Sequence, residues 1–395
     1  MKILEGGLET VGGYSFSALK CGIRYRDRLD LALIYSEKPC HASGVFTTNR
    51  IFAAPVRLCR ERIAGPVQAV LINATNANAC TGDEGYANAV ALTGALSSRL
   101  GIKPEAVLMA STGIIGVQLP LEKMQNSLPE LAANLAPEHS HTLAKAIMTT
   151  DTFPKEVAVS FSSSGGEFHI AGIAKGAGMI APHMATLLAF LLTDAPLPGD
   201  EADRIFKRCI DRTLNSITID GDMSTNDTAL LLSPQDGPIL QGADLSAFEE
   251  ALMEVLGGLA RLIVKDAEGA TRLVTISLKG AATEEDARRA ARAVAESLLV
   301  KTALFGKDPN WGRIACAAGY SGAQVEEKRL TISFEDIPIF GNGKPLSFDR
   351  EALASVMDRR EYTIHVDLGL GNGSFSYLTS DLTYDYVKIN AEYST

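Results

Sequence analysis

Short apolar runs alternate with helix-like patterns along the whole 395-residue chain. Nine runs are rich in aliphatic and β-branched residues and end at glycine or polar residues, which predicts β-strands. These runs are 30–36, 67–73, 106–112, 156–161, 167–174, 271–278, 329–334, 362–368 and 373–379. The alternation of strands with helices predicts a layered α+β protein and leaves the topology open.

Three segments carry the period of an amphipathic helix. From Leu245 to Ile263, apolar residues recur three and four positions apart on one face. Thr283 is a predicted N-cap with Asp286 three positions on, and an alanine-rich helix is expected to run from there to Leu298. A more polar helix is predicted over 200–214. The short stretch "APLPG" at 195–199 is the expected seam between lobes.

One long run between Lys175 and Asp194, "KGAGMIAPHMATLLAFLLTD", holds 18 residues without a formal charge when its histidine is neutral. This is the nominal length of a membrane helix. However, the chain offers no flanking basic cluster, no aromatic belt and no second span. We therefore interpret the apolar half of the run as a strand buried on both faces, and expect no membrane interaction.

Composition and charge narrow the function further. The chain is 46% hydrophobic and 21% charged, with a net charge of −10, which argues for solubility and against a general nucleic-acid-binding surface. The N-terminus shows no signal-peptide core, so a cytoplasmic location is expected. Six cysteines lie far apart without a CxxC pair, which favours reduced thiols and no zinc site.

The sequence matches none of the common motifs for a catalytic nucleophile, a metal site or a phosphate-binding loop. Instead, small polar and glycine-rich clusters follow several apolar runs, at the places where a rigid scaffold positions loops. They are "NATNANACTG" at 73–82, "STGIIG" at 111–116, "MTTDTFPK" at 148–155, "TIDGDMSTNDT" at 218–228 and "FGKDPNWGRIA" at 305–315. Each alone reads as a plain turn, but together they indicate a wide site built from many loops.

Thr186 lies inside the long uncharged run. A threonine there is ordinarily a β-former. Its hydroxyl becomes a nucleophile when its own α-amine is free to act as base, and an internal threonine gains such an amine only if the preceding bond is cut. The upstream glycines and proline permit the unusual backbone that self-cleavage requires.

Taken together, "KGAGMIAPHMATLLAFLLTDA", "STGIIG", "MTTDTFPK", "DGDMSTNDT", "FGKDPNWGRIACAAGYSG" and the ending "DLTYDYVKINAEYST" resemble the ArgJ family. These are the ornithine acetyltransferases, or glutamate N-acetyltransferases, of arginine biosynthesis. The resemblance extends from "GVFTTNRIFAAPV" to the last residue and implies the family's α/β/β/α sandwich, similar to DmpA-type aminopeptidases. It departs from the family at Ala177, where serine is frequent, and at His183, where asparagine is frequent.

The resemblance implies self-cleavage between Ala185 and Thr186, giving an α chain of 1–185 and a β chain of 186–395 that stay in one fold. Thr186 would then relay acetyl from N2-acetylornithine to glutamate by ping-pong transfer, with its amine as base. Thr112 and Gly113 match the family's oxyanion donors. The implied substrate-binding residues are Thr149 or Thr150, Lys175, Thr186, Glu268, Asn390 and Thr395.

The resemblance also implies the partners. No metal or redox cofactor is expected, acetyl-CoA is a second expected acetyl donor, and two α and two β chains are expected to assemble. His183 is given no catalytic role.

One alternative is a self-cleaving DmpA-like peptidase or amidase, in which water takes the acyl group. Another is an amino-acid-binding protein without activity, against which the retained Thr186, Thr112, Gly113 and Lys175 argue.

Overall fold

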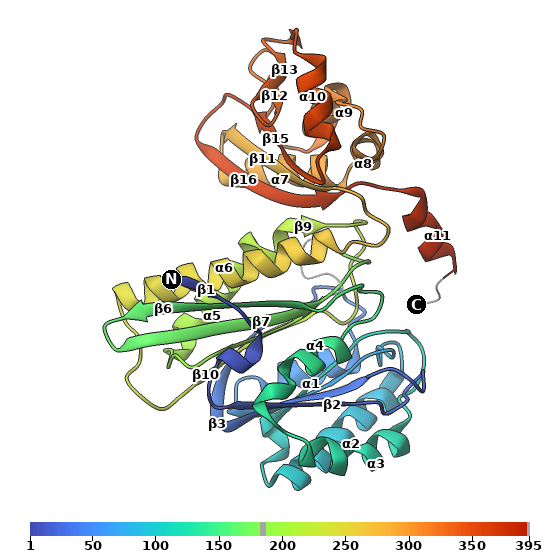
Figure 1. The fold of residues 1–395 in the computed structure, drawn as a ribbon, viewed down its shortest axis with the longest axis vertical. Coiled ribbons are helices and arrows are strands. Elements are labelled where there is room, and N and C mark those ends of the chain that lie inside the picture. The colour runs from blue at the N-terminus through green and yellow to red at the C-terminus, as the bar shows by residue number, and fades with distance from the viewer. Residues whose placement is uncertain (182–186, 393–395) are drawn as a thin grey trace. The chain divides into compact units, whose positions relative to one another are not determined.

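The computed structural model describes residues 1–181 and 187–392, and it divides into two compact units (Figure 1). Among the described residues, the first unit holds 1–215 and 222–263, and the second holds 216–221 and 264–392. The stretch 195–199, which the sequence marks as a seam, lies inside the first unit, so this prediction is wrong. The units are described separately below.

The first unit is built on a sheet that, within the described residues, has nine strands. They are β1 (Lys2–Leu4), β2 (Tyr14–Leu19), β3 (Leu31–Phe46), β4 (Val67–Asn73), β5 (Val107–Ser111), β6 (Lys155–Ser163), β7 (Gly166–Lys175), β8 (Leu188–Thr193) and β10 (Thr228–Pro234). The order is β1-β6-β7-β8-β10-β3-β4-β5, with β2 also paired to β3. Its helices are α1 (Ala54–Arg62), α2 (Gly82–Leu100), α3 (Leu121–Ala133), α4 (Ser140–Ala146), α5 (Gly199–Arg212) and α6 (Ala243–Lys265).

Strand β3 joins two layers of this sheet. Its first half pairs with β2 and β4, and its second half, from Cys40 to Phe46, pairs with β10. The register shifts between Tyr35 and Cys40, around the exposed Glu37 and Lys38. Such an irregularity bends a strand. The sequence predicted only the apolar first half, 30–36, because the bend places charged residues in mid-strand.

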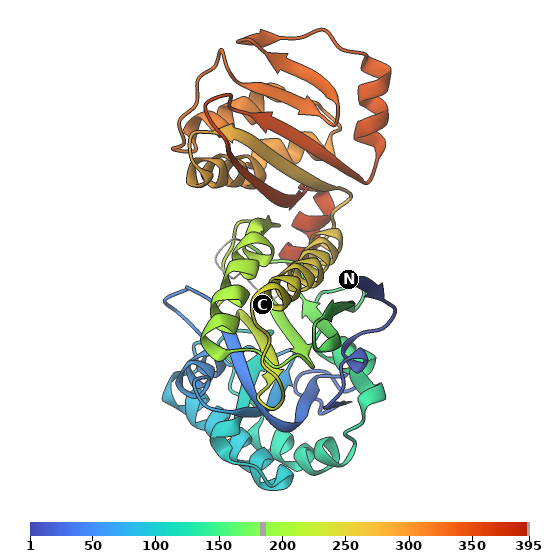
Figure 2. The same cartoon turned by 90° about the vertical axis from the view of Figure 1, so that its left-hand side faces the viewer.

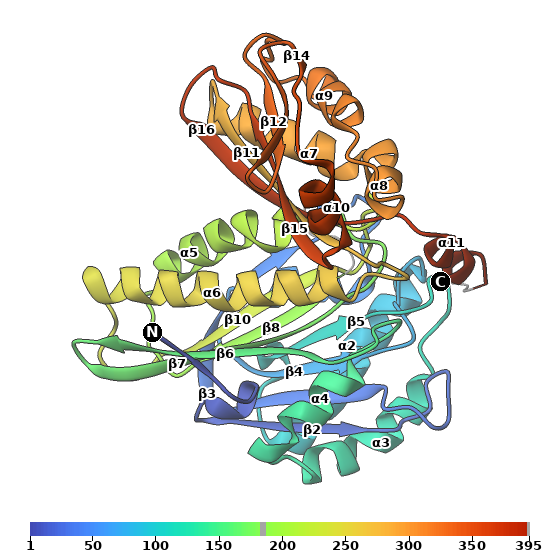
Figure 3. The same cartoon turned by 45° about the horizontal axis from the view of Figure 1, so that its top comes forward.

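The bent sheet forms the inner layers of a four-layer sandwich (Figures 1 and 3). Alternate residues of β4, such as Val70 and Ile72, enter a core shared with Leu188, Phe190 and Leu192 of β8. Their neighbours on β3, β4 and β5 enter a second core against α2 and α3. Helices α5 and α6 cover the opposite outer face, where α6 approaches β7 closely at Gly172. This arrangement confirms the expected α+β sandwich.

The second unit has its own sheet, which is shown with its strands side by side in Figure 2. Its order is β14-β13-β12-β15-β11-β16-β9. The strands are β9 (Ile217–Thr218), β11 (Leu273–Ala281), β12 (Thr331–Phe334), β13 (Ile337–Gly341), β14 (Lys344–Pro345), β15 (Glu361–Asp367) and β16 (Gly373–Ser380). The helices are α7 (Glu284–Glu296), α8 (Leu298–Phe305), α9 (Trp311–Tyr320), α10 (Arg350–Asp358) and α11 (Tyr384–Glu392). Small residues of α7 pack on β11 and β16.

The structure tests two further predictions, one of a helix and one of a strand. The helix expected from Thr283 to Leu298 ends at Glu296, because Ser297 is extended and caps the next helix by accepting from the Val300 N–H. The strand expected in the long uncharged run is present as β8, which is buried throughout. Among the described residues, no helix has the length and apolar character needed to cross a membrane.

Candidate active site

The Thr112–Gly113 turn follows β5 and is clamped on both sides by backbone hydrogen bonds. Thr112 N donates to Asn73 O at 3.0 Å, and Ile114 N donates to Thr75 O at 3.3 Å. Gly113 has a φ of +134° and faces the backbone of Thr75 so closely that a Cβ would collide with it. Within the described part of the chain, nothing accepts a hydrogen bond from the Gly113 N–H, so this donor is available to a ligand.

The loop that supports this turn is itself held in an uncommon conformation. Thr75, Asn78 and Cys80 all have positive φ, which costs free energy for residues with a side chain. The amide side chains of two asparagines compensate: Asn73 Nδ2 donates to Asn76 O at 2.8 Å, and Asn76 Oδ1 accepts from Asn78 N at 2.8 Å. The polar cluster "NATNANAC" is therefore the scaffold of the turn.

Lys175, the last residue of β7, meets Thr112 across the sheet end. Its Nζ donates to Thr112 Oγ1 at 3.3 Å, and the two residues are 3% and 4% exposed. Because the threonine oxygen accepts this bond, its own hydrogen is left to donate elsewhere. The structure thus brings together two predicted site residues that lie 63 positions apart.

Asp151 is a buried acid that the sequence did not single out. Its Oδ1 accepts from Lys155 Nζ at 2.6 Å and from Gly176 N at 2.7 Å, while its Oδ2 accepts from Thr149 N at 2.9 Å. Burial alone would raise the pKa of Asp151, but the charges of Lys175 and Lys155 outweigh it and lower the pKa to about 2. A charged Asp151 therefore holds the backbone N–H groups of Thr149 and of Gly176, the residue that follows Lys175.

Thr149 and Thr150 are both half-buried in the loop before β6. The Arg28 guanidinium donates to the carbonyl oxygens of Met148 and of Thr149, the latter at 2.8 Å. The loop is therefore held through its backbone, and the contact of Thr149 or Thr150 with substrate stays a prediction. The only sequence signal for Asp151 and Lys155 was their spacing of four within "MTTDTFPK".

In the second unit, the structure joins Glu268 and Asn390, which the sequence predicted separately. Asn390 Nδ2, on α11, donates to Glu268 Oε2 at 2.9 Å. Gly269 makes this approach possible: with φ of +65° it lies against the backbone of Tyr386, and its carbonyl accepts from Thr383 Oγ1 at 2.8 Å. This bond uses only Oε2 of the Glu268 carboxylate.

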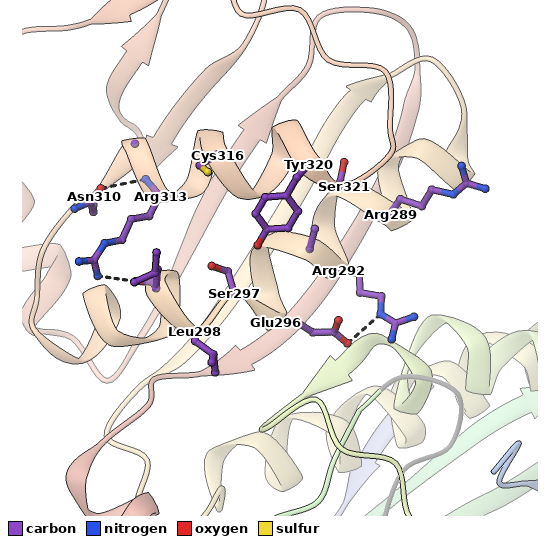
Figure 4. A pocket seen from close by; sticks show the side chains of 13 residues that line it. Arg289, Arg292, Glu296, Ser297, Leu298, Asn310, Arg313, Cys316, Tyr320 and Ser321 are labelled. Atoms are coloured by element: carbon purple, nitrogen blue, oxygen red, sulfur yellow. Dashed lines mark hydrogen bonds and ion pairs between the residues drawn. The ribbon is translucent and has the colours of Figure 1, made fainter. Parts of the chain in front are cut away.

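A pocket of about 980 Å³ in the second unit lies between α7, α8 and α9 (Figure 4). Three arginines line it, but each is engaged: Arg289 with Glu285, Arg292 with Glu296, and Arg313 with the carbonyl oxygen of Leu299. No predicted site residue lines this pocket. We therefore place the candidate site at the Thr112–Lys175 cluster.

Four residues named by the sequence analysis, Ala185, Thr186, His183 and Thr395, lie outside the described residues. The nearest described neighbour of the proposed nucleophile is Leu187. Among the described residues, no group of three or more histidine, cysteine, aspartate or glutamate side chains could hold a metal ion.

Comparison with known proteins gives a consistent result. The ArgJ family model matches residues 15–395. The arginine biosynthesis bifunctional protein ArgJ of Geobacter sulfurreducens is 49% identical over 391 residues, which cover 98% of this chain and 100% of that protein. The glutamate N-acetyltransferase of Methanosarcina mazei is 44% identical over 405 residues and is matched over 100% of both chains. The solved ArgJ structure from Bacillus halodurans is 36% identical with a TM-score of 0.50, covering 52% of this chain and 98% of that one.

Proposed function

This chain belongs to the ArgJ family of arginine-biosynthesis acyltransferases, and from that membership we propose that it transfers acetyl from N2-acetylornithine to glutamate through an acetylated Thr186. The observation that carries the proposal is the buried pairing of Lys175 with Thr112, beside a Gly113 N–H that donates to no acceptor among the described residues. This is a preorganised set of donors of the kind that acyl transfer requires.

The nucleophile is generated by self-cleavage. The Thr186 hydroxyl attacks the carbonyl carbon of Ala185, the peptide nitrogen leaves as the free amine of Thr186, and water opens the resulting ester. The new amine has an ordinary pKa near ~7.7–8.0, which suits a base at neutral pH.

Transfer follows in two balanced halves. The Thr186 amine takes the hydroxyl proton, and the oxygen attacks the acetyl carbonyl of acetylornithine. The oxyanion is stabilised by the Thr112 hydroxyl and the Gly113 N–H and collapses to release ornithine, whose nitrogen receives the proton. Glutamate then attacks the acetyl ester with its neutral amine. The bond between the acetyl carbon and the Thr186 oxygen breaks, and the Thr186 amine carries the proton from the glutamate nitrogen to that oxygen, which regenerates the hydroxyl.

Substrate recognition needs a cation for each carboxylate and an acid for the ornithine ammonium. Lys175 supplies the cation, with Thr149 or Thr150 beside it, and Glu268 with Asn390 supplies the acidic end. Thr395 completes the set. We further propose acetyl-CoA as a second donor and an assembly of two α and two β chains.

The decisive experiment compares the intact mass of wild type with Thr186→Ala under denaturing conditions, and assays both with acetylornithine and glutamate. Thr186→Ser, which keeps a hydroxyl, is the matched control. We expect wild type and Thr186→Ser to give two pieces, the second beginning at position 186, and Thr186→Ala to stay whole and inactive. Brief exposure to acetylornithine should add one acetyl group to the 186–395 piece.

Two results would change this conclusion. An active wild type that remains a single chain would exclude the N-terminal-threonine mechanism. Cleavage of the acetyl ester by water at the same rate with and without glutamate would favour the DmpA-like hydrolase instead.

A further inference from the structure

Asp227 precedes β10 and holds the residue that follows the proposed nucleophile. Its Oδ1 accepts from Leu187 N at 2.9 Å, and Thr228 N donates to Leu187 O at 3.2 Å. Both peptide groups of Leu187 are therefore fixed. The N–H that Asp227 binds belongs to Leu187, the residue that directly follows the proposed nucleophile in the sequence.

Its neighbour Asn226 holds the opposite side of the candidate site. Asn226 Nδ2 donates to Ser111 O at 2.8 Å and to Ala77 O at 2.6 Å. Ser111 O belongs to the peptide bond that leads into Thr112. Asn226 is 5% exposed, and it is fixed in turn because Ser224 Oγ accepts from its N–H at 2.9 Å.

Two adjacent side chains thus bind the backbone next to the proposed nucleophile and the backbone next to the proposed oxyanion donors. One binds the peptide after Thr186, and the other binds the peptide before Thr112. The Cα atoms of neighbouring residues are held about 3.8 Å apart, so the two elements that Asn226 and Asp227 bind are tied to one short segment. Because Asn226 and Asp227 share one backbone, the spacing between nucleophile and oxyanion donors depends on them.

The burial and protonation of the Asp227 carboxyl are compatible with a role as a fixed hydrogen-bond acceptor. The side chain is completely buried, and its Oδ2 has no hydrogen-bond partner among the described residues. Burial raises the pKa of Asp227 well above its ordinary value, although the Leu187 N–H and the charge of Lys175 oppose this. Accepting from Leu187 needs only one oxygen, which a neutral carboxyl or an amide also provides.

We propose that Asn226 and Asp227 are a positioning pair for the reaction at residue 186: Asp227 aims the nucleophile and Asn226 aims its oxyanion donors. The inference rests on the proposed function, because it takes Thr186 as the nucleophile. A misplacement of about 1 Å between reacting groups lowers a rate by about 100-fold. Loss of either side chain should therefore lower kcat rather than raise KM.

The test uses the full chain with Asp227→Ala, Asp227→Asn and Asn226→Asp. Asp194→Ala is the matched control, because Asp194 Oδ1 accepts from His169 N at 2.7 Å just beyond the far end of β8. Self-cleavage is followed by intact mass and transfer by kcat and KM. We expect about 100-fold losses of both rates for Asp227→Ala and of transfer kcat for Asn226→Asp, with KM changed less than about threefold.

The conservative replacement supplies the second readout. Asp227→Asn keeps an oxygen for Leu187 N and should restore both rates to within about tenfold of wild type. Asp194→Ala should leave both rates within about threefold. If Asp227→Ala does not fold, Asn226→Asp and Asp227→Asn still decide the matter, since they change no side-chain volume appreciably.

Three outcomes would overturn the inference. Wild-type kcat in Asn226→Asp would show that the donors need no such support. Equal losses in Asp227→Ala and Asp194→Ala would reduce the effect to strand stability. An Asp227→Asn variant as slow as Asp227→Ala would show that the carboxyl proton, and not the hydrogen bond, is required. Activity in Thr186→Ala would instead overturn the proposed function itself.

Discussion

The two units carry their candidate residues in opposite settings. In the first unit, Thr112 and Lys175 are 4% and 3% exposed and sit in a network of buried hydrogen bonds. In the second unit, Asn390 is exposed and its bond to Glu268 faces solvent. Charge that develops during a reaction is stabilised best by fixed, water-excluded groups, whereas capture of a zwitterionic substrate needs accessible ones. Under the proposed function, we therefore expect the first unit to set the rate of acetyl transfer and the second unit to set the affinity for substrate.

In each unit, two backbone segments pack closely at one glycine. The two glycines therefore allow a matched test of the different roles expected for the units. Gly113 lies against Thr75 and Asn76, and Gly269 lies against Asp385 and Tyr386. Both have a φ that side chains rarely adopt. The same substitution, alanine, can therefore be made at both.

Gly113→Ala should have the largest effect. The new Cβ would collide with the backbone of Thr75 and Asn76, and the turn would have to move. We expect a loss of at least about 100-fold in kcat for acetyl transfer, because one oxyanion donor is displaced, and a destabilisation on the order of 3 kcal/mol. Transfer kinetics and urea unfolding measure these; an unchanged kcat would remove Gly113 from the oxyanion site.

Gly269→Ala should act on affinity. Its Cβ would lie 2.6 Å from Tyr386 N and 2.8 Å from Asp385 C, so α11 would shift and the Asn390–Glu268 bond would weaken. We expect KM for acetylornithine to rise about tenfold, with kcat within about threefold of wild type. If kcat fell as far as in Gly113→Ala, the division of roles between the units would be wrong.

Each unit also contains a buried lysine, and the two lysines have different partners. Of these substitutions, that of the lysine in the second unit should affect activity least. Lys155 bonds to the Asp151 carboxylate, whereas Lys301 bonds to hydroxyls of Thr379 and Ser380 and to the Ser380 carbonyl. Burial lowers the pKa of Lys301 to about 8, although the charges of nearby acids oppose this.

This shift predicts a pH dependence of stability. Between about pH 8 and about pH 10 the unfolded chain binds a proton at position 301 that the folded chain has released, so the free energy of unfolding should rise with pH, by at most about 1.4 kcal/mol per unit. Lys301→Met should flatten this rise without changing transfer near neutral pH. Denaturant unfolding across the window measures it; an equal slope in both proteins would contradict the assignment.

Local patterns predicted the elements well where burial and periodicity agree. Strand β4 is predicted at its observed bounds, because an apolar run ends there at asparagine. The bend in β3 and the break at Ser297 escaped prediction, since each depends on packing against distant strands or on a single capping side chain.

The candidate site residues come from motif resemblance and stay predictions, whereas the hydrogen bonds that surround Thr112 and Lys175 were not predicted. Asp151 acts on Lys175, 24 positions away in the sequence, and Asn226 acts on Ser111, 115 positions away. An acid in a polar loop looks the same in sequence whether it meets water or a buried lysine. Only the folded sheet shows which of these contacts is made.

The strand order β7-β8-β10-β3 has a consequence for the proposed cleaved form of the protein. Strands β8 and β10 follow position 186, yet they lie between β7 and β3, which precede it. Strands of the two pieces would therefore alternate in one sheet. Separating the pieces would require the hydrogen bonds between β7 and β8 and those between β10 and β3 to break together. Dilution should therefore not dissociate them, and pieces from two differently labelled preparations should not exchange on mixing.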